Sequence, residues 1–326
     1  MKTIAFFNNK GGVGKTSLVY HLAWIFSELG KNVIAADLDP QANLTSMFLN
    51  DDRLEELWPD DGHSNTIFGA IEPILKGTGD IANPHIESID DNLGLLVGDL
   101  WLSMFEEKLS NAWAGSYRGD EADLRKTSAF YRILLKASEQ RKADLVLIDI
   151  GPNLGAINRS AMIAAQNIVI PLAPDLFSLQ GLRNLGATLK IWSSEWQEIL
   201  KKPTNLPLPS GSMKPAGYVV MQHAIKSNRP TKSYLRWIER IPNHYREFVL
   251  NTKEEENVSL ANDPYLLSTL KHYRSLMAMA MEARKPIFKL APGDGALGSH
   301  FTLAQECYKD FKELALKIAK SCDITI

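Results

Sequence analysis

The chain has 326 residues, of which 45% are hydrophobic and 23% charged, a composition ordinary for a soluble globular protein. No segment approaches the roughly 18 consecutive apolar residues of a membrane span. The first predicted strand starts almost at residue 1, so we expect no signal peptide. The two cysteines, Cys307 and Cys322, have no partner motif, so we expect reduced thiols, no zinc or iron–sulfur site and a cytoplasmic location.

The first predicted elements are a buried strand at residues 3–7 and a helix at residues 17–26, joined by a glycine-rich turn. Glycines let backbone N–H groups converge on an anion, and the helix N-terminus adds partial positive charge. We therefore predict a phosphate-binding loop in which Lys15 contacts the β- and γ-phosphates and the Thr16 hydroxyl ligates Mg²⁺. The predicted nucleotide-binding residues are Gly11, Gly12, Val13, Gly14, Lys15, Thr16 and Ser17.

The turn departs from the common pattern G-x-x-x-x-G-K-[ST] at two places. Asn9 stands where the first glycine is expected, and a second lysine, Lys10, precedes the glycine pair. K-G-G-V-G-K-T at residues 10–16 is the deviant Walker A box, and the sequence here resembles the ParA/MinD family of P-loop ATPases. The resemblance implies an ATP-dependent homodimer in which Lys10 of each subunit reaches across to the nucleotide of its partner, as a catalytic residue beside Lys15.

A second strand is predicted at residues 31–37 and ends in two acids. Asp37 and Asp39 are separated by one residue, so on a strand they point to the same face, at the edge where metal and water sit. We predict that Asp39 orients the attacking water and that Asp37 holds the water shell of Mg²⁺. D-x-D-P-Q-x-N at residues 37–43 also resembles the second family box, and an Asx turn before Pro40 is the alternative.

Residues 51–123 contain seventeen Asp and Glu but only four Lys and Arg. No linker-like stretch isolates this segment, so we predict an acidic elaboration of the sheet at about residues 50–123 within a single domain, 1–326. Helical spacing predicts a helix at residues 66–75, and residues 111–123 are predicted to be a loop.

The nearly continuous apolar run at residues 143–149 predicts a strand that is buried on both faces and ends in an acid. This is the Walker B form, in which Asp149 holds the water shell of Mg²⁺. The turn at residues 150–155 follows, and its backbone could sense a γ-phosphate. The family usually has two prolines in this turn, whereas this chain has Gly151 and Pro152.

The C-terminal half is basic, with eleven Lys and Arg against three acids at residues 177–246. After a strand at residues 216–221, Gln222 is predicted to contact the adenine base, where the family reads it. The predicted DNA-binding residues are Lys226, Arg229, Lys232, Arg236 and Arg240, of which the last three would form one ridge along a helix. A solvated basic face is the alternative. A last strand is predicted at residues 285–288 and a closing helix at residues 301–320.

The alternation of strands and helices predicts an α/β fold, a doubly wound, mostly parallel sheet flanked by helices. The resemblance implies an ATP- and Mg²⁺-dependent partition ATPase that binds DNA non-specifically, associates with the nucleoid in its ATP state, and hydrolyses ATP slowly until a ParB-like or other adaptor stimulates it. The alternatives are a MinD-like membrane ATPase and, third, an ATP-dependent ligase or synthetase. The closing helix carries acids on its polar face, so no stable membrane association is expected.

Overall fold

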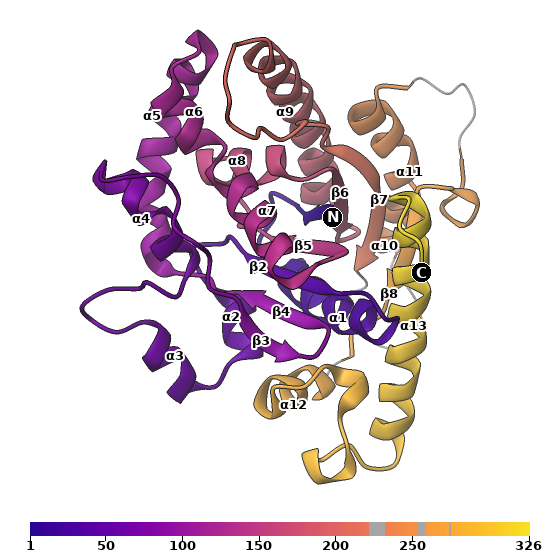
Figure 1. Ribbon diagram of the computed structural model, residues 1–326. Coiled ribbons are helices and arrows are strands. Elements are labelled where there is room, and N and C mark those ends of the chain that lie inside the picture. Colours follow the sequence, from indigo (N-terminus) through magenta and orange to yellow (C-terminus); the bar gives the residue numbers. More distant parts are fainter. Residues whose placement is uncertain (222–231, 253–257, 274) are drawn as a thin grey trace.

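A computed structural model describes the chain except for residues 222–231, 253–257 and 274 (Figure 1). Its strands are β1 (Lys2–Phe6), β2 (Val33–Asp37), β3 (Glu87–Asp90), β4 (Leu93–Leu96), β5 (Leu145–Asp149), β6 (Asn167–Leu172), β7 (Lys214–Met221) and β8 (Leu266–Leu270). Its α-helices are α1 (Lys15–Glu28), α2 (Asn43–Phe48), α3 (Asp51–Leu57), α4 (Ile67–Lys76), α5 (Phe105–Arg118), α6 (Glu121–Thr127), α7 (Ala129–Arg141), α8 (Ala156–Ala164), α9 (Leu176–Leu200), α10 (Lys232–Ile238), α11 (Ile241–His244), α12 (Ser275–Ala283) and α13 (Ser299–Ser321).

The strands that the structure describes form one eight-stranded sheet in the order β3-β4-β2-β5-β1-β6-β7-β8. Each neighbouring pair is parallel except β3 and β4, which are antiparallel at one edge. The predicted doubly wound, mostly parallel sheet is therefore confirmed. β5 lies between β1 and β2, so the carboxyl ends of these three strands meet at the centre of one edge.

Helices cover both faces of the sheet and create two cores (Figure 1). Side chains alternate along the first strand as the pleat requires: Ala5 and Phe7 enter the core beneath α5, α7, α8 and α9, whereas Ile4 and Phe6 enter the core beneath α1 and α13. All four are fully buried. The central strands are thus fixed from both sides, and their carboxyl ends provide a rigid base for the site.

The predicted loop at residues 111–123 is wrong. α5 continues to Arg118, and only two residues separate it from α6. Gly119 ends α5 in the left-handed conformation with φ 86°, and the Asp120 carboxylate then accepts a hydrogen bond from the Asp123 N–H to begin α6. The two helices pack so closely that a Cβ on Gly115 would lie 1.7 Å from the Asp123 carboxylate. Gly115 therefore allows α5 and α6 to pack closely against each other.

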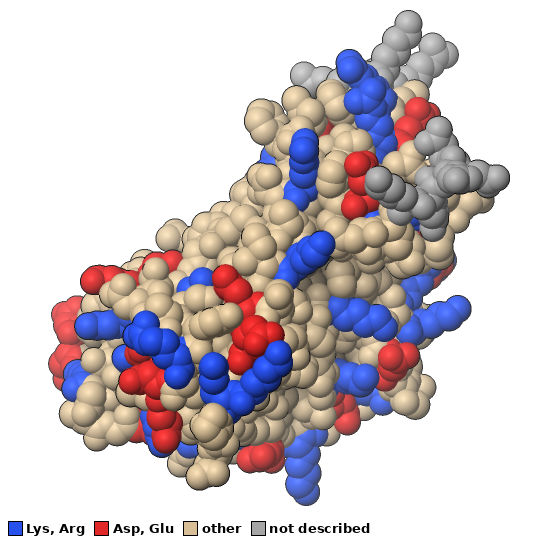
Figure 2. Space-filling model, turned by 90° about the horizontal axis from the view of Figure 1, so that it is seen from above, with Lys and Arg blue, Asp and Glu red and all other residues tan. Residues whose placement is uncertain are grey.

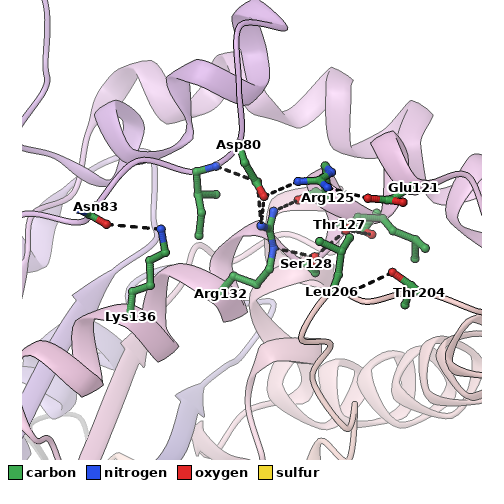
Figure 3. A network of polar contacts seen from close by, with 12 residues as sticks. Asp80, Asn83, Glu121, Arg125, Thr127, Ser128, Arg132, Lys136, Thr204 and Leu206 are labelled. Carbon is green, nitrogen blue, oxygen red and sulfur yellow. Dashed lines mark hydrogen bonds and ion pairs between the residues drawn. The ribbon is translucent and has the colours of Figure 1, made fainter.

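Arginines from α6 and α7 pair with part of the acidic elaboration (Figure 3). The buried Arg132 places one guanidinium nitrogen 2.7 Å from both carboxylate oxygens of Asp80, and Arg125 donates to the same carboxylate at 2.6 Å. Arg125 also bonds Glu121, while Lys136 reaches Asn83. The loop around Asp80 is therefore bound to the helices beside the sheet.

The predicted strand at residues 285–288 is also wrong. The edge position belongs to β8, and Ile287–Lys289 forms a 3₁₀ turn after Pro286. Proline has no N–H to donate to a strand ladder, and the Ile287 N–H is used by the His21 ring, 3.2 Å away. The closing helix is confirmed as α13, whose apolar residues Phe311, Leu314 and Ile318 are buried.

His21 joins α1 to this C-terminal region and should make stability depend on pH. Burial lowers the pKa of His21 to about 4, against the raising effect of its hydrogen bond to the Ser17 carbonyl. Between pH 6.5 and 4 the imidazole of the unfolded chain binds a proton that the buried imidazole of the folded chain does not. The free energy of unfolding therefore has its full value above pH 6.5 and decreases as the pH falls towards 4. The loss is on the order of 3 kcal/mol.

We expect a His21→Gln variant to be less stable than wild type at pH 7.5, because it loses the stacking of the imidazole on Phe311. The variant should, however, lose less of its remaining stability between pH 6.5 and 4.5. Urea unfolding at the three pH values measures both effects. Parallel losses in the two proteins over the acidic window would show that His21 does not titrate as its burial requires.

Candidate functional site

The loop between β1 and α1 has the geometry of a phosphate cradle. Gly12 and Gly14 have φ values of 71° and 87°, a left-handed conformation that favours glycine. A Cβ on Gly11 or Gly12 would meet no described atom within 4 Å, so the loop opens onto free space. Because Gly14 is the N-cap of α1, it provides no side chain to occupy the first N–H groups of the helix. These groups are available to an anion.

Lys15 lies buried at the base of this cradle, and its ammonium donates to the Asn8 carbonyl at 3.2 Å. Burial lowers the pKa of Lys15, against the raising effects of Asp149 and Asp39. The Asn8 side chain in turn donates to the Pro171 carbonyl at 2.6 Å, which ties the loop to β6. The predicted lysine and two of the predicted acids are thus brought together.

Lys10 lies at the mouth of the loop and forms an ion pair with Asp175 of the same chain. Both side chains are about one-third exposed, at 32% and 31%. Asp175 is also the N-cap of α9, where its carboxylate accepts the Ser178 N–H at 2.9 Å. The Lys10 backbone N–H donates to the Asn8 side chain at 2.9 Å. The second lysine is therefore held beside the cradle, on the solvent side, by the start of α9.

Two carboxylates lie side by side behind the cradle, because the parallel register of β2 and β5 pairs Asp37 with Asp149. Both are fully buried. Burial raises the pKa of Asp37, although hydrogen bonds from the Thr45 N–H and hydroxyl, both 2.8 Å, oppose the rise. Burial and the charge of Asp37 raise the pKa of Asp149 well above its ordinary value, against the opposing effects of Thr16 and Lys15.

The residues present fit a magnesium ion. Neither carboxylate oxygen of Asp149 makes a hydrogen bond of ordinary distance and angle to a described residue, although both are buried and the Thr16 side chain lies near enough to lower the pKa of this carboxyl. A buried carboxylate in this state requires a cation or ordered water. Oxygen ligands are those that Mg²⁺ prefers, and Thr16 and Asp37 are the predicted residues beside Asp149. The Asp37 oxygens already accept hydrogen bonds within the chain, so the Asp149 oxygens are the more available ligands for Mg²⁺.

Asp39 lies at the same edge, 8% exposed. Its carboxylate accepts the Gln41 N–H at 3.1 Å, and its own N–H lies 3.3 Å from an oxygen of Asp37. The turn after β5 passes close by, because a Cβ on Gly151 would lie 3.2 Å from the Asp39 carboxylate. The bond to Gln41 is the Asx turn that the sequence also allowed, so this carboxylate has a structural partner.

A side chain that the sequence analysis did not single out holds the turn at residues 150–155. The Asn158 amide donates to the Gly151 carbonyl at 2.8 Å and to the Asn153 carbonyl at 2.6 Å. The Asn153 side chain accepts the Gly155 N–H at 2.9 Å. The turn is thus closed on itself and held against the start of α8, and no local motif marks Asn158 for this role.

A cavity of about 150 Å³ adjoins the cradle on the side of β7 and β8. Gly12, Val13, Gly14 and Ser17 form part of its wall, and the wall as a whole is mostly apolar. Met221 at the end of β7, Tyr273, Met277 and Phe311 belong to that wall. The predicted base contact, Gln222, follows Met221 in the chain but lies outside the described residues. Val13 and Ser17 therefore border a space that is continuous with the phosphate cradle.

The predicted basic ridge is only partly described. Lys226 and Arg229 lie outside the described residues, as does the side chain of Lys232. The single helix expected through Arg240 is wrong, because α10 ends at Ile238 and α11 begins at Ile241. Pro242 explains the break, since a proline clashes with the carbonyl four residues earlier in a continuous helix.

Arg236 and Arg240 still lie close together after this break. Their guanidinium groups stand 4.9 and 5.4 Å from the ring of Trp237. The face drawn in Figure 2 carries Lys and Arg side chains with Asp and Glu interspersed among them. Any anionic partner on that face would therefore contact small groups of Lys and Arg side chains rather than a continuous basic surface.

Comparison with known proteins decides the family. The profile of the AAA_31 family, described as an AAA domain, matches residues 1–202. The chain belongs to this family. Its relatives include a ParA family protein of Chlamydia trachomatis, 33% identical over 60% of this chain and 67% of the relative. Another is the cell division protein PomZ of Myxococcus xanthus, 26% identical over 76% of this chain and 64% of PomZ.

The fold of this chain is shared with solved structures. An ATP complex of a Cyanothece McdA variant aligns with a TM-score of 0.66 over 100% of this chain and 98% of McdA, at 16% identity. At that identity the likeness shows the fold alone. Among the helices that the structure describes, none is long and apolar enough to cross a bilayer.

Proposed function

We propose that this protein binds and hydrolyses ATP, dimerises in the ATP state, and binds DNA non-specifically to segregate or position a cargo. The observation that carries the ATPase part is the arrangement at the carboxyl edge: an open glycine cradle, the buried Lys15, and the unpartnered carboxylate of Asp149 beneath it. Membership of the AAA_31 family supports the same reading.

The chain's own residues divide the work of hydrolysis. The free N–H groups of the cradle and the Lys15 ammonium bind and orient the β- and γ-phosphates. Thr16, Asp149 and Asp37 would hold Mg²⁺, which supplies positive charge that neutralises the developing phosphate charge. Asp39 orients the attacking water, because its carboxylate lies at the same edge, beside the turn at Gly151. Lys15 stabilises the charge that develops as the γ-phosphate leaves.

The cavity beside the cradle suits the adenine base. Its position next to Gly12, Gly14 and Ser17 allows one nucleotide to lie across cradle and cavity together. Its wall, which includes Met221, Met277 and Phe311, offers the apolar surface that a planar base requires. Gln222 would add a polar contact at the end of β7.

We propose that the two subunits associate through the surface that carries the cradle. On dimerisation the Lys10–Asp175 ion pair would break, and Lys10 would instead contact a phosphate of the ATP bound to the partner subunit. Its place at the mouth, one-third exposed, supports this exchange. A ParB-like or other adaptor would stimulate hydrolysis. The named relatives differ in role, from ParA family to cell division, so we leave the cargo open. Nucleoid association in the ATP state would follow from the DNA binding.

DNA binding should depend on nucleotide and salt. We expect the protein to bind random-sequence duplex DNA with ATP but not with ADP or without nucleotide, and binding should weaken steeply between 50 and 200 mM salt, in the manner of phosphate contacts. Replacing Lys232, Arg236 and Arg240 by alanine should lower the affinity at least about tenfold and flatten the salt dependence. Fluorescence anisotropy measures both.

The control is ATP turnover, which the triple variant should retain because the replaced residues lie outside the cradle. Unchanged DNA affinity would remove these residues from the proposal. Absence of DNA binding in every nucleotide state would instead favour the membrane or ligase alternatives. The membrane alternative requires a free apolar helix face, whereas α13 buries Phe311, Leu314 and Ile318 against the rest of the chain.

A further inference from the structure

Glu106, on the first turn of α5, reaches across to the beginning of α8. Its two carboxylate oxygens accept the backbone N–H groups of Ala156 and Ile157, at 2.6 and 2.9 Å. The bonded residues are fifty positions apart in the chain. A carboxylate at a helix N-terminus satisfies N–H groups that have no partner inside the helix, and its charge is favourable there.

This arrangement differs from that of the four α-helices that the structure describes with a side-chain cap of their own. α3, α4, α6 and α9 are each capped by their own N-cap residue, Asn50, Thr66, Asp120 and Asp175. α8 instead has Gly155 at its N-cap, which has no side chain to offer. The cap of α8 is therefore supplied by another helix, and this couples the position of α8 to that of α5.

Glu106 occupies the space that a side chain at Gly155 would take. A Cβ on Gly155 would lie 2.5 Å from the Glu106 carboxylate and 2.9 Å from the Asn153 side chain. The φ of Gly155 is −75°, which any residue adopts, so glycine is needed for space rather than for backbone conformation. The sequence of the turn is thus fitted to receive a side chain from α5.

The same turn leads back to the reacting edge. Gly155 is bonded to Asn153, and Asn158 bonds the carbonyls of Asn153 and Gly151. Gly151 then lies against Asp39. An anchor at one end of the turn therefore sets the position of the backbone at its other end, beside the carboxylate proposed to orient water.

We infer that Glu106 is a positioning residue for ATP hydrolysis: it holds the turn at residues 151–155 in register with Asp39 and the γ-phosphate. This inference rests on the proposed ATPase function. Glu106 touches neither nucleotide nor water, and acts through the N–H groups of Ala156 and Ile157. Its loss should slow the chemical step and leave nucleotide binding, which depends on the cradle, almost unchanged.

The test compares Glu106→Gln with Glu107→Gln, which removes the same charge from the neighbouring, exposed position on α5. A glutamine keeps the size of the side chain but presents an N–H₂ group to one of the two N–H donors, so one bond is lost. We expect Glu106→Gln to lower kcat for ATP at least about tenfold, with KM changed less than about twofold. Glu107→Gln should match wild type in both.

Hydrogen exchange supplies a readout that does not depend on turnover. The amides of Ala156 and Ile157 should exchange faster in Glu106→Gln than in Glu107→Gln, and faster exchange should extend into residues 151–155. If Glu106→Gln fails to fold, Gly155→Ala is the second variant, because its Cβ displaces the carboxylate while leaving the charge in place. It should reproduce the fall in kcat at unchanged KM.

The outcomes separate the two proposals. Wild-type protein that hydrolyses ATP together with a fully active Glu106→Gln variant would overturn the role of Glu106 and leave the ATPase proposal standing. A fall in affinity for ATP at unchanged kcat would likewise overturn it, since the cradle and not the turn would be affected. Wild-type protein that hydrolyses no ATP would refute the proposed function and the role of Glu106 in it.

Discussion

Replacing Lys15 by alanine should abolish ATP turnover, with a fall of at least about 100-fold. Lys15 is the buried cation of the cradle, and its ammonium donates to the Asn8 carbonyl. Without it, Asp149, Asp37 and Asp39 would face the phosphates with no buried positive charge from the base of the loop. Charge repulsion should therefore weaken nucleotide binding as well as slow hydrolysis.

Phosphate release measures turnover, and a fluorescent ATP analogue measures binding. The matched control is Lys31→Ala, which removes a lysine just beyond the other end of the same helix, α1, and should leave both quantities unchanged. A Lys15→Ala protein that is folded and hydrolyses ATP at the wild-type rate would show that this loop is not the phosphate site.

The central strands could be predicted because each is an apolar run buried on both faces, and residues 143–149 are the clearest case. The edge strands could not. Glu87–Asp90 alternates half-buried and exposed side chains and pairs antiparallel to β4, so it lacks the continuous apolar run of the central strands. The strand expected at residues 285–288 does not form, because Pro286 has no N–H to donate and the Ile287 N–H bonds the His21 ring.

In the site, too, local sequence patterns indicate some residues, whereas contacts between distant segments could not be predicted. The positions of Lys15 and Thr16 follow from the glycine-rich turn that precedes α1. Those of Asp37 and Asp149 follow because each ends a strand, and the parallel register of β2 and β5 brings these two strand ends together. The partners that hold the site come from distant segments. Asp175 lies 165 residues from Lys10, and Glu106 lies 50 residues from Ala156. No local spacing records such contacts, because only the packing of α5 and α9 beside the sheet creates them.

Replacing Asp39 by alanine should separate ATP binding from hydrolysis. The cradle and Lys15 remain, so ATP should bind with affinity within about threefold of wild type, whereas turnover should fall at least about 100-fold because the water is no longer oriented. If bound ATP holds two subunits together, the variant should remain dimeric with ATP, because it does not hydrolyse the nucleotide. Light scattering after size exclusion should then report twice the mass of the chain with ATP and the mass of one chain without nucleotide.

Two further variants make this result specific. Asp39→Asn keeps an oxygen that can accept the Gln41 N–H, so it preserves the Asx turn and removes only the charge. Loss of turnover in Asp39→Asn assigns the effect to the carboxylate, whereas wild-type turnover would reduce Asp39 to a turn residue. Adding Lys10→Ala to Asp39→Ala should return the ATP-bound protein to single chains, because the lysine that reaches the partner is gone. A double variant that stays dimeric would contradict the exchange of Lys10 from Asp175 to the partner's phosphate, since another contact would then hold the two subunits.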